Sequence, residues 1–246
     1  MNRLESVHSP QLPLPTARDC RLKARENSLP ANPIPKRAII VLTAGFFVLF
    51  IGGGARFAIG LNLRPMVGEF GWDRSQLGAA VAVFQIVSAA TMVVAGTLAD
   101  RISLRLVLGG GLLAAGVSIA MMSLVSTPWH ALLIYGVFFG IGNGMASITP
   151  VGVMVTRAFP GRTGFANAVV SSGMSVGQLL MIAVLAAVLV SIGWRSVFIW
   201  VGVAHLLILP LVLAAVPGSG DAKAHAAKPP ASGMSVAEAR RTSRFW

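Results

Sequence analysis

The chain has 246 residues, of which 55% are hydrophobic and only 11% charged, with a formal net charge of +12. An ordinary soluble domain carries about 25% charged residues, so the composition excludes that class. The apolar runs reach the roughly 20 residues that a spanning helix needs, and they do not alternate with polar positions as spanning strands do. We therefore predict an all-α membrane protein.

The chain begins with a polar tail over residues 1–37, which is rich in Pro and charge. It holds the lone Cys20 and no apolar core of a cleavable signal. We expect this tail to be disordered and cytoplasmic. A single cysteine allows no intrachain disulfide.

Six apolar runs follow and predict six transmembrane helices in one bundle over residues 38–216. The runs cover approximately residues 38–61, 77–99, 104–126, 129–155, 163–192 and 194–216. Residues 62–76 are expected to form a longer loop, and residues 96–105 a short polar loop. Residues 217–246 are polar and Pro-containing, and we expect a cytoplasmic linker that leads to a seventh helix missing from the chain.

Two short segments are similar in sequence, and one precedes the second apolar run while the other precedes the fifth. Phe70, Arg74 and Ser75 precede one, and Phe159, Arg162 and Thr163 precede the other. The segments fall on opposite sides of the membrane, as an inverted three-plus-three repeat requires.

The basic residues are distributed unevenly. With the N-terminus inside, three bases lie in outer loops (Arg64, Arg74 and Arg195), Arg56 lies within a run, and the other sixteen of the 20 are inside. This positive-inside bias predicts that both termini are cytoplasmic. The charge therefore has a topological cause, with attraction to anionic lipid, and does not indicate a nucleic-acid partner.

The polar loop carries a recognisable motif. It resembles the loop between the second and third helices of the major facilitator superfamily, Gly-x-Leu-Ala-Asp-Arg-x-Gly-Arg-Lys. Ser103 and Leu104 depart from that pattern, which is matched by Gly96, Leu98, Ala99, Asp100, Arg101 and Arg105. Together with the six runs and the following linker, the resemblance implies the N-terminal half of that fold, in an integral protein of a bacterial inner membrane.

Shorter stretches indicate a branch of the family. The first run with its loop, and the turn Gly193-Trp194-Arg195, look like the monocarboxylate porters and oxalate–formate antiporters. The resemblance implies a secondary active transporter that works by alternating access on a small organic anion such as a monocarboxylate.

Arg56 is the first candidate for contact with such a solute. It lies about 27 Å along the first run at 1.5 Å per residue, near the outer edge of the hydrocarbon. A cation there either faces the interior of the bundle and attracts an anion, or extends to the outer headgroups. The resemblance favours the first interpretation.

Four residues of the polar loop are candidates for a gate, namely Gly96, Asp100, Arg101 and Arg105. The resemblance implies that this Asp contacts the opposite half when the inner side is closed. The alternative is a set of positive-inside charges with one neutralising acid.

Three amides at membrane depth, Asn143, Gln85 and Gln178, must each find a partner because an unpaired amide is costly there. They either bond between helices or line the cavity. Gly136, Gly140 and Gly144 recur on one face of the fourth run and predict close helix packing.

We expect no enzyme activity, no catalytic residues, no metal site and no cofactor, since the sequence shows no metal-ligand cluster, phosphate loop or nucleophile–base pair. A half transporter lacks the facing wall of its cavity, so we expect a truncated chain that is inactive alone unless it dimerises or pairs with a second six-helix half. The alternatives are a carrier of another solute, such as a sugar or a cation, and a non-transporting membrane sensor or assembly subunit.

Overall fold

The computed structural model describes residues 36–216, and the expectations for the N-terminal tail and the C-terminal linker lie outside them. Within this range six helices or helix groups are long and apolar enough to cross a membrane. They confirm the expected six spans, and the span predicted at 163–192 coincides with the helix α9 (Thr163–Ile192). All of the regular structure in the described part is helical.

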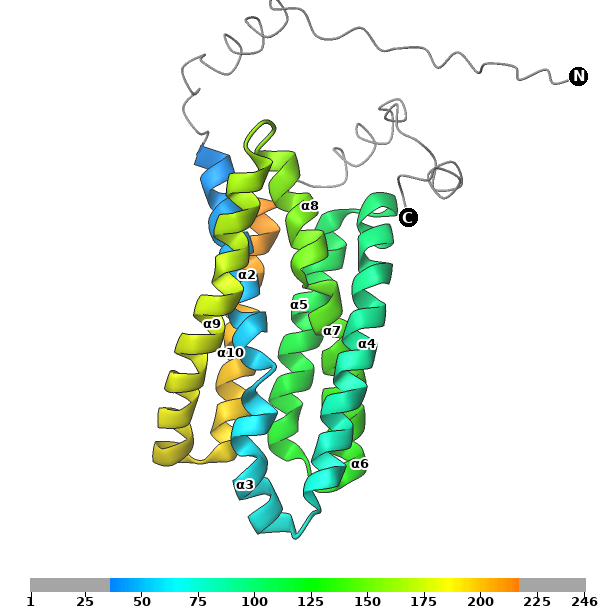
Figure 1. The fold of residues 1–246 in the computed structure, drawn as a ribbon, viewed down its shortest axis with the longest axis vertical. Coiled ribbons are helices and arrows are strands. Elements are labelled where there is room, and N and C mark those ends of the chain that lie inside the picture. The colour runs from blue at the N-terminus through cyan, green and yellow to red at the C-terminus, as the bar shows by residue number, and fades with distance from the viewer. Residues whose placement is uncertain (1–35, 217–246) are drawn as a thin grey trace, which may run out of the picture. The chain divides into compact units, whose positions relative to one another are not determined.

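The helices lie side by side in one bundle (Figure 1). The helix α2 (Lys36–Ala55) packs against α9 and α10 (Trp194–Ala215), and α10 packs against α5 (Leu104–Met121). The helix α4 (Arg74–Arg101) packs against the fourth span. That span consists of α6 (Pro128–Ala131), the π-helix η2 (Leu132–Phe139), α7 (Gly140–Met145) and α8 (Ile148–Ala158).

We name the two ends of the bundle by the first span. The proximal end is where α2 begins, and it also holds the α4–α5 and α8–α9 connections. The distal end holds the end of α3 (Ala58–Phe70), the turn after η1 (Met122–Leu124) and the α9–α10 turn at Gly193.

The core of the bundle has two layers of buried apolar side chains. One contains Val48 and Ile51 with residues of α5, α8 and α10, and the other contains Ala55 and Ile59 with residues of α4, η2 and α10. The outer surface is also apolar, as shown by Val190 at 89% exposure and Leu179 at 72%. A surface of this kind is stable in lipid and not in water, which supports the membrane assignment.

The expected loop at 62–76 is wrong for residues 62–70 and 74–76, which are helical. The helix α3 continues to Phe70 although it contains Arg64, Pro65 and Glu69, and only residues 71–73 connect it to α4. Gly71 ends α3 with φ at +68°, and its N–H donates to the carbonyl of Val67. The left-handed conformation is accessible to glycine at little cost, which explains why the helix stops there.

Candidate functional site

The first span is interrupted at Arg56 and Phe57, which separate α2 from α3. Three glycines, Gly52, Gly53 and Gly54, precede the break. A Cβ at Gly53 would lie 2.7 Å from the carbonyl oxygen of Met174 on α9, so a larger residue would push the helices apart. The N–H of Phe57 donates to the carbonyl of Gly54 at 3.0 Å, a bond to the residue three positions earlier. The helix therefore tightens and then breaks beside α9.

The fourth span is interrupted too, at Ala146 and Ser147 between α7 and α8. Pro150 lies in the first turn of α8, where a missing N–H costs little. The helix α10, by contrast, continues through Pro210 without a break. Both breaks border one pocket, because Gly52, Arg56, Ala146 and Ser147 all line it.

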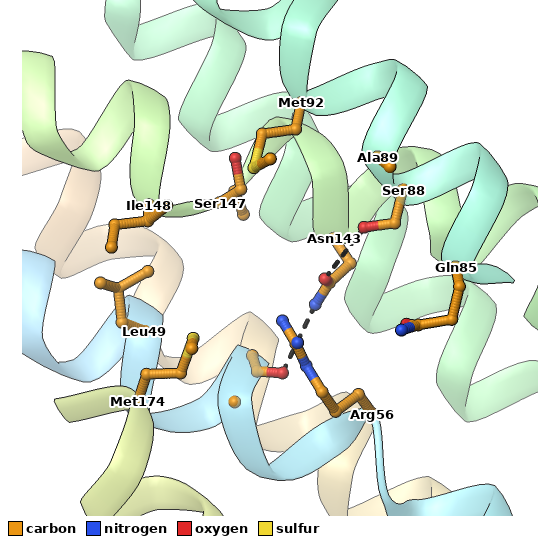
Figure 2. Close-up of a pocket in the computed structure, with 13 residues that line it drawn as sticks. Leu49, Arg56, Gln85, Ser88, Ala89, Met92, Asn143, Ser147, Ile148 and Met174 are labelled. Atoms are coloured by element: carbon orange, nitrogen blue, oxygen red, sulfur yellow. Dashed lines mark hydrogen bonds between the residues drawn. The ribbon is translucent and has the colours of Figure 1, made fainter. Parts of the chain in front are cut away.

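The pocket has a volume of about 240 Å³. Figure 2 shows Leu49 and Met174 on one side and Gln85, Ser88 and Met92 on the other, with Asn143 and Ser147 between them. Among the described lining residues Arg56 is the only charged one, and there is no carboxylate. The pocket is therefore mostly apolar, with one fixed positive charge.

The side chain of Arg56 extends from the break into the pocket toward Asn143 (Figure 2). Its backbone carbonyl accepts the hydroxyl of Tyr135 at 2.7 Å, which ties the break to η2. The buried Nε of Arg56 and the buried Oγ of Ser147 have no hydrogen-bond partner among the described residues. The end of the Arg56 side chain is directed into the pocket, so its terminal N–H groups are the donors that a polar ligand there could reach (Figure 2).

Asn143 lies in the same pocket and is only 5% exposed. Its carbonyl accepts the hydroxyl of Ser88 at 3.4 Å, and its amide donates to the carbonyl of Gly52 at 3.5 Å. The residue thus connects α7 with α4 and α2. Asn143 therefore forms hydrogen bonds between helices and also lines the pocket.

The two glutamines are placed differently. Gln85 on α4 is exposed and lines the pocket opposite Met174. Gln178 on α9 is half-buried and is not among the lining residues. The fold thus brings Arg56, Asn143 and Gln85 together at one site and leaves Gln178 outside it.

The expected polar loop at 96–105 is wrong except at residues 102–103, because α4 continues to Arg101 and α5 begins at Leu104. The residues of this polar segment lie at the proximal end. Asp100 and Arg101 are the last two residues of α4, and Arg105 follows in the first turn of α5, where it is exposed. A Cβ at Gly96 would lie 3.1 Å from Cγ2 of Thr149 on α8. The loop therefore adjoins α8, and Arg157 of α8 donates to the carbonyl of Ala99 at 3.5 Å.

Three glycines of the fourth span, Gly136, Gly140 and Gly144, face α4. A Cβ would meet Val83 at 2.9 Å from Gly136, Val87 at 3.1 Å from Gly140 and Thr91 at 2.6 Å from Gly144. Such short distances mean that the two helix backbones approach closely along this face.

Sequence reasoning missed most of the apolar lining and the break itself. Ser88, Met92, Met174 and Ser147 look like ordinary helix residues in the sequence, and only the fold brings them together. The triplet Gly52-Gly53-Gly54 was the one available signal, since glycine is a poor helix former. Within the described residues no group of three His, Cys, Asp or Glu side chains is placed to hold a metal ion.

The sequence model of the Major Facilitator Superfamily matches residues 45–246. The chain belongs to this superfamily. The match agrees with the resemblance seen in the polar loop and the six spans. The superfamily is one of transporters and not of enzymes.

Several relatives align with most of the chain. An uncharacterized MFS-type transporter, YcxA of Bacillus subtilis, is 27% identical over 70% of this chain and 45% of its own length. A probable L-galactonate transporter of Escherichia coli is 31% identical over 69% of this chain and 37% of its own. The 4-hydroxybenzoate transporter PcaK of Acinetobacter baylyi is 24% identical over 76% of this chain and 41% of its own length. The chain thus spans less than half the length of these relatives.

A solved structure has the same fold. The crystal structure of the peptide transporter POT in complex with sulfate (E310Q mutant) superposes with a TM-score of 0.61 at 17% identity. The superposition covers 83% of this chain and 46% of that one. The six spans therefore correspond to about half of a major facilitator fold.

Proposed function

We propose that this chain forms one six-helix half of a secondary active transporter for a small organic anion, such as a monocarboxylate. The observation that carries the proposal is Arg56, the one charge among the described lining residues of the pocket. A guanidinium binds a carboxylate through two parallel hydrogen bonds, and the bonds are stronger where water is excluded. The names of the relatives that carry L-galactonate and 4-hydroxybenzoate agree with an anionic solute.

The lining also suggests how the solute is oriented. Its carboxylate would meet Arg56, with the hydroxyl of Ser147 and the amide of Gln85 as further polar contacts. Its remaining surface would contact the thioethers and the alkyl groups of Met92, Met174 and Leu49. Few polar groups in an apolar pocket are typical of small-molecule sites.

Transport requires that the pocket opens to each side in turn. We infer that the open side of the pocket is closed by a second set of six helices or by a second copy of the chain, since the part of the chain that aligns covers less than half of each relative. Movement of one half against the other exposes a site between the halves to each side alternately. In this proposal Gly96, Asp100, Arg101 and Arg105 form the gate at the proximal end, which faces the cytoplasm.

Binding of a radiolabelled aromatic monocarboxylate, 4-hydroxybenzoate, to the purified chain in lipid vesicles tests the proposal. Arg56→Gln should weaken binding by about 10- to 100-fold, the range expected for a hydrogen-bonded charge pair. Arg56→Lys should weaken binding less, because it keeps the charge and loses the two-pronged geometry.

The matched control is Arg64→Gln, which removes an arginine from α3 outside the pocket lining. It should leave binding unchanged. Equal losses in the Arg56 and Arg64 variants, or saturable binding that survives Arg56→Gln, would show that Arg56 is not the anchor of the anion.

A further inference from the structure

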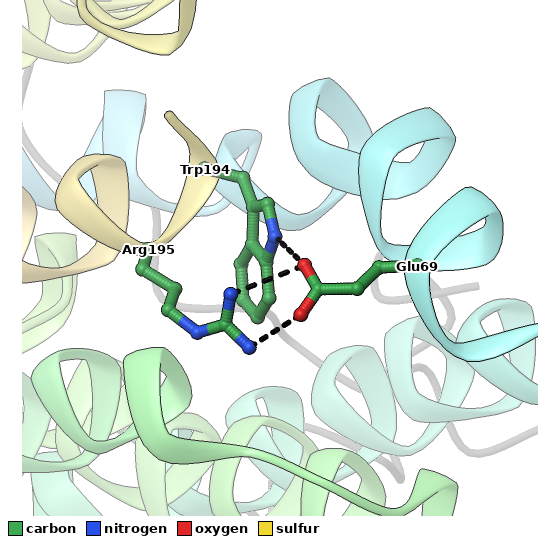
Figure 3. Close-up of polar contacts among 3 residues, drawn as sticks. All are labelled: Glu69, Trp194 and Arg195. Carbon is green, nitrogen blue, oxygen red and sulfur yellow. Dashed lines mark hydrogen bonds and ion pairs between the residues drawn. The ribbon is translucent and has the colours of Figure 1, made fainter. Parts of the chain in front are cut away.

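A compact polar cluster joins α3 to α10 at the distal end, away from the pocket. Glu69 accepts two hydrogen bonds from Arg195, at 2.6 Å to Oε1 and 3.1 Å to Oε2 (Figure 3). The indole N–H of Trp194 donates to Oε2 as well, at 2.7 Å. One carboxylate therefore receives three donors from the first two residues of α10.

Aromatic rings surround this ion pair. The guanidinium of Arg195 lies 4.3 Å from the ring centroid of Trp194 and 5.9 Å from that of Phe70. Phe70 stacks on Trp72 at 4.5 Å and meets Trp194 edge-on at 5.9 Å. Cation–π contacts of this kind add to the attraction between the charges. The cluster thus fastens the last turn of α3 from several directions.

The same helix leads directly to the pocket. The helix α3 starts two residues after Arg56 and has 13 residues, a length of about 20 Å at 1.5 Å per residue. Its other end is tied by the bond from Tyr135 to the carbonyl of Arg56. A helix of this length that is tied at both ends couples the position of one end to that of the other.

We propose that Glu69, Trp194 and Arg195 form a latch that positions α3 and, through it, the backbone of the break that carries Arg56. Glu69 and Arg195 are positioning residues, since neither lines the pocket. The effect of the latch on the break does not depend on the solute, and only its consequence for anion binding rests on the proposed function.

The exposure of the pair makes the latch reversible. The side chains of Arg195 and Glu69 are 48% and 40% exposed. Exposed ion pairs are weak because water competes for both partners. The latch can therefore open without unfolding the helices, and an open latch frees α3 to move about the break at Phe57.

A spin label at the break tests this coupling. Phe57 is 43% exposed and offers a labelling site by Phe57→Cys in a Cys20→Ser background. In lipid vesicles, Glu69→Gln and Arg195→Gln should each raise the mobile fraction of the label by about fivefold, a change within the range of an exposed ion pair. The double variant should show no more than either single one, because both remove the same contact.

Two further variants separate positioning from a general loss of structure. Exchange of the charges by Glu69→Arg with Arg195→Glu should lower the mobile fraction again. Asp73→Asn removes an acid from the same end, keeps a residue suited to begin α4, and should leave the spectrum unchanged. Amide hydrogen exchange rates at residues 55–58 compare the same variants with the parent chain, without the Phe57→Cys substitution or a label.

The proposal is overturned if neither single variant changes the label or the exchange rates, if the two effects simply add, or if Asp73→Asn has the same effect. Failure of the anion-binding assay would leave these outcomes unaffected, so the two proposals are tested separately.

Discussion

Arg56 and Asn143 lie in the same pocket, and their surroundings give them different roles. Asn143 has partners on both sides of its amide, Ser88 and the carbonyl of Gly52. The Nε of Arg56 has none among the described residues. A polar group whose bonds are already made holds the wall of the pocket, whereas a guanidinium whose terminal N–H groups point into the pocket is available to a ligand.

Removal of the Asn143 amide should loosen the wall. Asn143→Leu leaves the hydroxyl of Ser88 and the carbonyl of Gly52 without this partner, and both contacts are long. We expect a loss of about 1 kcal/mol in the free energy of unfolding, the usual size of an interhelical hydrogen bond. Thermal unfolding in detergent measures it, as a fall of about 2–4 °C in the melting temperature.

Gln178→Leu is the control for this prediction, because that amide lies on α9 outside the pocket lining. A fall as large for Gln178→Leu as for Asn143→Leu would contradict the role given to Asn143. An unchanged melting temperature for both would show that the two long contacts contribute nothing.

At the scale of the elements, glycines determine how closely the helices approach. A Cβ at Gly173 would lie 2.6 Å from the carbonyl oxygen of Phe46, and a Cβ at Gly177 would collide with the carbonyl oxygen of Phe50. Both contacts lie between α9 and α2. Without these glycines the two helices could not bring Met174 and Arg56 to the same pocket.

Gly177→Ala should therefore destabilise the bundle, since backbone atoms cannot move aside as a flexible side chain does. We expect a loss of about 1–3 kcal/mol, typical of overpacking. Gly78→Ala on α4 is the matched control, because nothing lies within 4 Å of its added Cβ. That variant should be neutral or stabilise by up to about 1 kcal/mol through helix propensity.

Unfolding by guanidinium chloride or heat in the same detergent measures the free energy of unfolding of Gly177→Ala, Gly78→Ala and the parent chain. Equal stability of Gly177→Ala and the parent chain would mean that α2 and α9 can separate at no cost.

The bounds of the elements show where sequence reasoning succeeds. The span at 163–192 has no charge and begins after a Pro-Gly-Arg turn, so both of its ends were predictable. The first span was predicted to end at residue 61 and to be followed by a loop that contains Arg64, Pro65 and Glu69. In the fold those residues continue a helix whose last turn is held by Trp194 and Arg195, more than 120 positions away. No local pattern could report such a contact.

At the scale of the whole molecule, the basic residues predict orientation. Cys20 lies outside the described residues, in the tail expected to be cytoplasmic. A membrane-impermeant maleimide should therefore label it in inside-out vesicles and not in right-side-out vesicles.

Arg74→Cys in a Cys20→Ser background should show the opposite pattern, because residue 74 begins α4 at the distal end. Labelling of Cys20 from the outer face would reverse the proposed orientation and place the polar loop outside.

The sequence alone determined the membrane class, the six spans and the family, because these depend on composition, on apolar run length and on a motif in one short loop. The tertiary structure decided which polar residues meet. It joined Arg56, Asn143 and Gln85 at one pocket, placed Gln178 outside its lining, and paired Glu69 with Arg195 at the distal end. The physical reason is that a span needs only apolar residues, whereas a site needs a register between helices that the close glycine contacts set.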